Sequence, residues 1–242
     1  MSKDASQLVQ KCTKCQQFAR LTQKPSNIQH PIGSPWPFAV WGMDILGPFP
    51  VFTVQKKFLI VAVDHFTKWV EVEAVPTITE ARVQHFFYKE IICRFGIPHT
   101  LITDNGKQFN NDKFKTFCSE LDIKLRFTSV AHPQTNGQTE VTNRTIMQGL
   151  KKRLDEMKGN WVEELNNVIW AYRTTPRTST GETPFRLTYG MDAVIPVEIG
   201  SVSYRVSEGV DPEVNNLNSR ICLDLLEERR EQASIVSEAQ KR

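Results

Sequence analysis

The stretch Phe38-Ala-Val-Trp-Gly-Met-Asp-Ile-Leu46 is the first of three consecutive strand-like segments in this chain. Residues 57–64 and 68–75 form the other two, and turn residues separate all three. Each segment is rich in Val, Ile, Phe or Trp, the residue types that favour extended backbone. Three short strands in direct succession predict an antiparallel meander.

Beyond the meander, helical and extended patterns alternate, which predicts an α/β fold. Apolar residues at mixed three and four spacing predict a helix over 79–94, which Gly96-Ile-Pro98 ends. The pattern then predicts strands at 100–103 and 123–128 and helices at 112–121, 138–158 and 161–174. Residues 174–198, rich in Pro and Gly, are expected to be irregular. An amphipathic helix is expected over 210–242, with one apolar stripe of Val214, Leu217, Ile221 and Leu225.

The composition is that of an ordinary globular protein. The chain has 242 residues, of which 40% are hydrophobic and 24% charged, so a disulfide knot and wholesale disorder are both excluded. A formal net charge of +3 is too small to indicate a nucleic-acid partner by itself. However, the six basic and eight acidic residues after position 204 give −2, which leaves +5 for residues 1–204.

The cysteines and the apolar runs point to a reducing compartment and no membrane. No apolar run is long enough to span a bilayer, and the N-terminal residues lack a secretory core, so the five cysteines are expected to be thiols. Cys12 and Cys15 have the Cys-x-x-Cys spacing of half a zinc site. The other half is missing, and an unmetallated pair is the simpler interpretation.

Asp104 stands at the end of a predicted strand, in Leu101-Ile-Thr-Asp104-Asn-Gly106. The carboxyl ends of strands in α/β sheets commonly present catalytic and ligand-binding groups. The alternative is a simple turn, because Asn and Gly tolerate positive φ.

Glu140 lies near the start of the predicted helix 138–158, where the helix dipole favours an acid. On a helical wheel the buried face consists of Ile146, Leu150, Leu154 and Met157, and beside it Arg144, Lys151 and Lys158 line up with Glu140. Such a row suits a phosphate backbone running past a metal-bound carboxylate. A solvated helix face is the competing interpretation.

The third acid is either Asp44 or Asp64, between which spacing alone does not decide. Asp44 lies inside an apolar strand, where an unpartnered charge is costly, whereas Asp64 precedes a turn-like segment. Three carboxylates on two strands and a helix suit a pair of hard divalent cations. In a two-metal site one ion activates the attacking oxygen and the other stabilises the leaving oxygen, so the implied reaction is phosphodiester cleavage or transfer.

Five motifs follow one another along the chain. They are Trp41-Gly-Met-Asp44-Ile-Leu-Gly-Pro48, Leu101-Ile-Thr-Asp104-Asn-Gly-Lys-Gln-Phe109, His132-Pro-Gln-Thr-Asn-Gly-Gln-Thr-Glu140, Ala171-Tyr-Arg-Thr-Thr-Pro176 and Gly181-Glu-Thr-Pro-Phe-Arg-Leu-Thr-Tyr-Gly190. These motifs resemble the catalytic core of gypsy-type LTR-retrotransposon integrases and occur in that family's order. Thirty-five residues separate Asp104 from Glu140, which is the spacing of the family, and the similarity covers about residues 8–200.

The resemblance implies a ribonuclease-H-like fold with a mixed five-stranded sheet flanked by helices. It implies Asp44, rather than Asp64, with Asp104 and Glu140 as a triad that binds two Mg²⁺ or Mn²⁺ ions. Family members process 3′ DNA ends and join them to target DNA, act as multimers, and work in the nucleus after a cytoplasmic particle stage. The DNA contacts implied by the resemblance are Gln134, Asn136, Gln138, Asn143 and Arg144, to which the cationic row adds Lys151 and Lys158.

The same resemblance divides the chain into three parts. Residues 1–35 are expected to be the remnant of an N-terminal zinc module, 36–200 the catalytic core with an extension, and 201–242 an amphipathic tail. Because the histidine pair of that module is absent, bound Zn²⁺ is not expected. Two hypotheses follow, an active polynucleotidyl transferase and a non-catalytic DNA- or protein-binding module derived from one.

Overall fold

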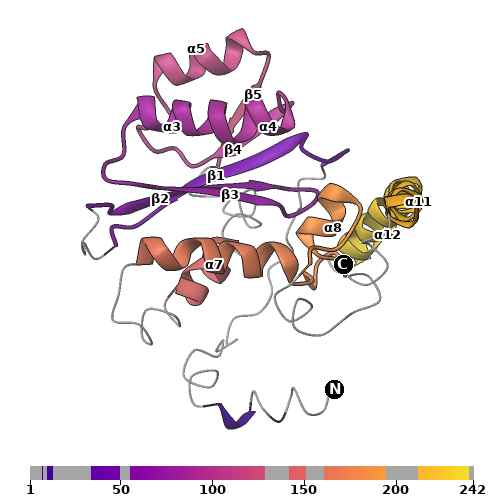
Figure 1. The fold of residues 1–242 in the computed structure, drawn as a ribbon. Helices are drawn as coiled ribbons and strands as arrows, with labels where there is room; N and C mark the ends of the chain where they lie inside the picture. Colours follow the sequence, from indigo (N-terminus) through magenta and orange to yellow (C-terminus); the bar gives the residue numbers. More distant parts are fainter. Residues whose placement is uncertain are drawn as a thin grey trace.

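A five-stranded mixed sheet forms the centre of the computed structural model (Figure 1). The structure describes residues 7, 10–12, 34–49, 55–128, 142–150, 161–194 and 212–239. Spatial order in the sheet is β3-β2-β1-β4-β5. The strands are β1 (Val40–Leu46), β2 (Phe58–Asp64), β3 (Val70–Val75), β4 (Thr100–Thr103) and β5 (Lys124–Phe127). The predicted mixed five-stranded sheet is confirmed.

The predicted meander is β1, β2 and β3, which pair antiparallel in that order. By contrast, β4 pairs parallel with β1, and β5 pairs parallel with β4. Two of the strands begin two residues later than the sequence indicates. Phe38 and Lys68 adopt left-handed backbone angles, with φ of 66° and 63°, so the extended ladder begins after each of them, at Val40 and Val70.

One face of the sheet is covered by α3 (Glu80–Phe86), η1 (Phe87–Ile92), α4 (Cys93–Phe95) and α5 (Asp112–Glu120) (Figure 1). The predicted helix 79–94 is thus three contiguous pieces, since its middle widens into a π-helix at η1. Apolar residues from these helices, among them Phe86 and Phe114, pack against Trp41 and Met43 of β1 in the larger core cluster.

The opposite face is covered by α7 (Trp161–Thr174) and the helix of residues 142–150. The predicted bounds of α7 are confirmed, as is its buried side, which consists of Trp161, Leu165, Val168, Ile169 and Tyr172. Ile146 and Leu150 are buried as predicted, whereas Leu154 and Met157 lie outside the described residues. Gly149 permits a close approach of the two helices, because a Cβ there would lie 2.8 Å from Val168 Cγ1.

The prediction that residues 174–198 are irregular throughout is wrong, because α8 (Pro184–Tyr189) lies within them. Thr183 caps its first turn by accepting a hydrogen bond from the Arg186 amide. Pro184 occupies the first helical position, and Gly190 ends the helix in the left-handed conformation. Pro and Gly here mark the two ends of a helix.

The tail contains two helices, α11 (Pro212–Asp224) and α12 (Leu226–Ala239), where the sequence indicates one. Its predicted stripe is largely exposed, at 59% for Leu217 and 46% for Ile221. The tail joins the remainder through α8, where the Arg230 guanidinium donates to the Leu187 carbonyl. None of the helices that the structure describes is long and apolar enough to cross a membrane.

Candidate active site

Asp44 lies near the end of β1 on the sheet face that α7 covers. Its residue partner across the sheet is Val61, which belongs to the core cluster on that face. The carboxylate is partly buried, and its Oδ1 atom accepts the Ile45 amide at 2.8 Å. The alternation of β1 therefore turns Trp41 and Met43 toward one core and Asp44 toward the other face.

Asp104 follows β4 directly and comes to the same end of the sheet. The parallel pairing sets Val40, Trp41 and Gly42 beside Thr100, Leu101 and Ile102. Extending this register by two residues brings Asp44 level with Asp104, and neighbouring strands lie about 4.8 Å apart. Asp104 Oδ1 accepts the Gly106 amide at 3.0 Å, so the Asp-Asn-Gly segment is both a turn and the support of this acid.

Asn143, from the helix of residues 142–150, contacts Asp44 across the surface of the sheet. Its Nδ2 atom donates to Asp44 Oδ2 at 2.6 Å, and the residue is only 5% exposed. Next to it, the Thr142 hydroxyl and the Tyr172 hydroxyl are 3.1 Å apart, which ties this helix to α7. The buried Asn143 amide thus links the helix of residues 142–150 to the acid on β1.

The remaining predicted site residues are distributed as follows. Arg144 is exposed, as a DNA-contacting side chain must be, while Asn143 faces the acid. Cys12 is half-buried. Outside the described residues lie Gln134, Asn136, Gln138, Glu140, Lys151, Lys158 and Cys15.

Asp64 occupies the opposite end of β1, because it pairs with Trp41. Its carboxylate is fully buried and accepts three hydrogen bonds, from the Phe38 amide at 3.1 Å and from the Thr67 amide and hydroxyl, both at 2.7 Å. Burial raises the pKa of Asp64, although the two Thr67 donors and the charge of Lys68 oppose the shift. The structure therefore gives Asp64 the turn role that the sequence favours for it.

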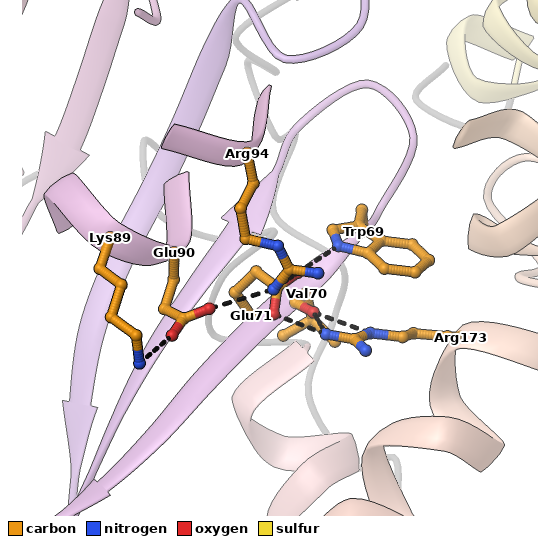
Figure 2. Close-up of polar contacts among 7 residues, drawn as sticks. All are labelled: Trp69, Val70, Glu71, Lys89, Glu90, Arg94 and Arg173. Atoms are coloured by element: carbon orange, nitrogen blue, oxygen red, sulfur yellow. Dashed lines mark hydrogen bonds and ion pairs between the residues drawn. The ribbon is translucent and has the colours of Figure 1, made fainter. Parts of the chain in front are cut away.

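A second charged cluster, which the sequence analysis does not identify, surrounds Glu71 on β3 (Figure 2). The Glu71 carboxylate accepts from Trp69 Nε1 at 2.8 Å and pairs with Arg94 at 2.9 Å and Arg173 at 2.7 Å. Arg173 also donates twice to the Val70 carbonyl. Trp69, Glu71, Arg94 and Arg173 are referred to below as the Glu71 cluster.

This cluster joins both helical layers to the edge strand β3. Arg94 comes from α4 on one face and Arg173 from α7 on the other (Figure 1). The Arg173 guanidinium also lies 4.3 Å from the centre of the Trp69 ring. In the sequence, Arg173 lies within the motif Ala171-Tyr-Arg-Thr-Thr-Pro176, which carries the family resemblance but does not indicate a role for this arginine.

The chemistry of the acidic end suits a hard divalent cation. Asp44 and Asp104 offer carboxylate oxygens, and the hydrogen bonds described above reach them from neutral amides. Among the residues that the structure describes, no three His, Cys, Asp or Glu side chains gather as a metal site. The described part therefore supplies two of the three predicted ligands, and these two fit.

The sheet has three antiparallel strands followed by two parallel ones, with helices on both faces and acids at the ends of β1 and β4. This arrangement is a ribonuclease-H-like fold. Residues 35–133 match the family model described as the integrase core domain. The resemblance of the chain to gypsy-type LTR-retrotransposon integrases is therefore confirmed.

Among curated relatives, the Transposon Tf2-3 polyprotein of Schizosaccharomyces pombe is 29% identical over 209 residues, which are 85% of this chain and 16% of the polyprotein. The chain thus spans about one sixth of the length of that relative. The HTLV-2 integrase catalytic core domain in complex with magnesium (trimeric form) superposes with a TM-score of 0.53 at 24% identity, covering 64% of this chain and 98% of that one. A simian T-cell lymphotropic virus intasome in complex with the PP2A regulatory subunit B56 gamma gives 0.59 at 20% identity, covering 81% and 69%.

Proposed function

We propose that this chain is the catalytic core of a retroelement integrase, a polynucleotidyl transferase that processes 3′ DNA ends and joins them to target DNA. The observation that supports it most directly is the arrangement of Asp44 and Asp104 on adjacent parallel strands, with Asn143 beside Asp44. Glu140 precedes Asn143 by three residues, which keeps the third acid within about 11 Å of Asn143 along the chain.

In this proposal the carboxylates of Asp44, Asp104 and Glu140 hold two Mg²⁺ or Mn²⁺ ions. Bound there, such a pair supplies activation of the attacking oxygen and stabilisation of the leaving oxygen at phosphorus. The chain's own contribution is to hold the acids charged and aligned. The ladder between β1 and β4 fixes the spacing of two of them, and backbone amides orient one oxygen of each.

DNA is the proposed substrate and partner, held beside the acids by exposed cations. Arg144 is exposed one residue after Asn143, so it supports this part of the proposal. Lys151, Lys158, Gln134, Asn136 and Gln138 complete the proposed contact set. By analogy with the HTLV-2 core, described in trimeric and dimeric forms, we propose that the chain acts as a homo-oligomer, and that it does so in the nucleus.

The test is an oligonucleotide nicking and strand-transfer assay with the purified chain in Mg²⁺ or Mn²⁺. We expect joined products that disappear on addition of EDTA and in the Asp104→Asn variant. Activity that survives this substitution would contradict the assignment. DNA binding without any metal-dependent product, in both ions, would favour the alternative of a non-catalytic binding module.

A further inference from the structure

We infer that Lys124 and Arg126, two exposed cations of the edge strand β5, bind the sugar-phosphate backbone of DNA that reaches the acidic end of the sheet. The inference rests on the proposed function, because it extends the contact surface for the same DNA substrate. Leu125 and Phe127 alternate with the two cations and pack against the larger core cluster. Since successive residues of a strand point to opposite faces, Lys124 and Arg126 point away from that core.

The two cations share a face of the sheet with Asp44. Trp41, Leu101 and Leu125 are in register across β1, β4 and β5, and all three contribute to the larger core cluster on one face. The residues that alternate with them, Arg126 on β5 and Asp44 near the end of β1, therefore belong to the other face. A ligand that lies over this face meets acids and cations together.

The strand register also sets how far the cations are from the acids. Ile102 pairs with Arg126, so Asp104 comes two residues beyond the level of Arg126 on the neighbouring strand. With about 3.3 Å per residue and about 4.8 Å between strands, the Cα atoms of Asp104 and Arg126 are about 8 Å apart, and Lys124 is about 14 Å from Asp104. Successive nucleotides of one DNA strand rise by about 3.4 Å, so these distances correspond to about two and four nucleotides.

The charges of β5 differ from those beside the opposite edge strand, β3. There, Arg94 and Arg173 both pair with the Glu71 carboxylate. Lys124 and Arg126 have no ion-pair partner within the part of the chain that the structure describes. Lys and Arg side chains whose charge is not matched by the protein are suited to phosphate oxygens.

The apolar cover on the face of Asp44 supports the same conclusion. The core cluster beneath α7 includes Leu59 and Val61 of β2 and Val70 of β3, and none of its described members comes from β4 or β5. At β5 this face carries exposed cations where β2 and β3 carry buried apolar residues. The sheet is thus accessible to a charged ligand on the side of β4 that lies away from β1.

Protection of an open sheet edge is the competing role for these cations. Lysines on an edge strand oppose pairing with the edge of another sheet, so this role predicts that their loss increases self-association. Phosphate binding predicts instead a loss of DNA affinity and of its salt dependence, because each phosphate contact releases counterions from DNA. The two roles are therefore separable by measurement.

The experiment measures binding of a fluorescently labelled DNA duplex to the purified full chain by anisotropy, in EDTA and over a series of salt concentrations. The test variant combines Lys124→Gln with Arg126→Gln. The matched control combines Arg82→Gln with Lys113→Gln, at exposed positions of α3 and α5 over the opposite face, so both variants lose the same charge.

We expect the Kd of the test variant to rise about 10-fold or more at about 0.1 M salt. The slope of log K against log salt should fall in magnitude by about 1.8, since each lost phosphate contact contributes about 0.9. The control variant should keep the Kd and the slope of the unsubstituted chain. A charge-conserving variant, Lys124→Arg with Arg126→Lys, should keep the slope as well.

Each outcome decides the inference. Weaker and less salt-dependent binding by the test variant, with an unchanged control, supports it. Equal binding by the test variant and the unsubstituted chain overturns it, as does an equal loss in the test and control variants, which would reflect net charge alone. Unchanged DNA binding with increased self-association in light scattering also overturns it and assigns the cations to protection of the edge.

Strand transfer by the unsubstituted chain in Mn²⁺ separates this inference from the proposed function. Joined products together with unchanged DNA binding by the test variant leave the proposed function in place and overturn the inference. If the unsubstituted chain binds no DNA duplex and gives no joined product, the proposed function fails, and the inference fails with it.

Discussion

The same sheet carries two acidic sites whose partners are of opposite kinds. At the end of β1 and β4, Asp44 and Asp104 accept hydrogen bonds from neutral amides. On β3, Glu71 pairs with two guanidinium groups and an indole NH (Figure 2). The amide donors of the first arrangement are neutral, whereas the two arginines of the second compensate the charge of the carboxylate within the protein.

The difference shows that burial of an acid does not by itself indicate function. Glu71 is more deeply buried than Asp44, at 4% exposure, yet its charge is matched by cations from two helices. Asp64 is buried still further and caps a turn. The charge of the partners, more than the depth of burial, separates a candidate ligand site from a structural one.

The largest expected effect is on catalysis, from Asp44→Asn. The substitution keeps the size of the side chain but removes an anionic ligand, so we expect metal-dependent strand transfer to fall by about 10³-fold or more. Because the Ile45 and Asn143 amides that donate to Asp44 are neutral, we expect little change of the melting temperature in metal-free buffer. Activity and melting of the same preparation check both expectations. A large loss of stability would erase the contrast with Glu71.

The second effect is on stability, from Glu71→Gln. The neutral side chain leaves Arg173 and Arg94 without their shared carboxylate, and breaking a buried ion pair typically costs about 3 kcal/mol. Chemical denaturation should show this decrease in the free energy of unfolding, while the Mn²⁺ affinity stays unchanged. Glu231→Gln, at an exposed position of α12, is the control and should leave both unchanged. Weakened Mn²⁺ binding by Glu71→Gln would show that the two sites are coupled.

A third effect compares the two arginines of the Glu71 cluster. The Arg173 side chain is 22% exposed and also contacts Val70 and Trp69, whereas that of Arg94 is 42% exposed. We expect Arg173→Met to lower the free energy of unfolding by about 2 kcal/mol, and Arg94→Met by less than about 1 kcal/mol. Denaturation curves of both variants decide this ranking. Equal losses would mean that the extra contacts of Arg173 contribute nothing.

Local patterns in the sequence were enough to predict most of the sheet and one of the candidate site residues. The bounds of β4 and α7 follow from short-range patterns, and so does the position of Asp104 at the end of a strand. Asp44 was distinguished from Asp64 only by the family resemblance, because both lie in apolar strands. The structure adds the physical difference, which is that Asp64 is enclosed by Thr67 and Phe38.

Local sequence patterns do not predict contacts between residues that are far apart in the chain. Asn143 and Asp44 are 99 residues apart, and Arg173 and Glu71 are 102 apart, so no local period reports either pair. In the tail, the apolar stripe predicts a helix but does not indicate which residues pack against that stripe. In the structure, Leu217 of this stripe is exposed. In contrast, the signal for α8 is local. A high content of Pro and Gly predicts irregular structure, but Pro184 at the first position and Gly190 at the end are typical of the two ends of a helix.

The smallest expected effect comes from the N-cap of α8, the helix that packs beside the Glu71 cluster. Phe185 and Tyr189 of α8 pack on Trp69, with ring centres 6.2 and 5.4 Å away, so fraying of α8 should loosen the Glu71 cluster alone. Thr183→Ala removes the cap, and a lost N-cap typically costs about 1 kcal/mol. We expect that decrease in the free energy of unfolding, with unchanged Mn²⁺ affinity.

The matched control for the cap is Thr188→Ala, in the last turn of the same helix. Its hydroxyl donates to the Pro184 carbonyl, four residues earlier, a local hydrogen bond that does not cap the helix. The decrease in the free energy of unfolding should therefore be smaller for Thr188→Ala than for Thr183→Ala. Equal losses would mean that Thr183 acts through general packing and not as a cap. A larger decrease in the free energy of unfolding for Thr183→Ala would show that Thr183 acts as the cap of α8. Together with an unchanged Mn²⁺ affinity, it would show that α8 supports the Glu71 cluster without affecting Asp44 and Asp104.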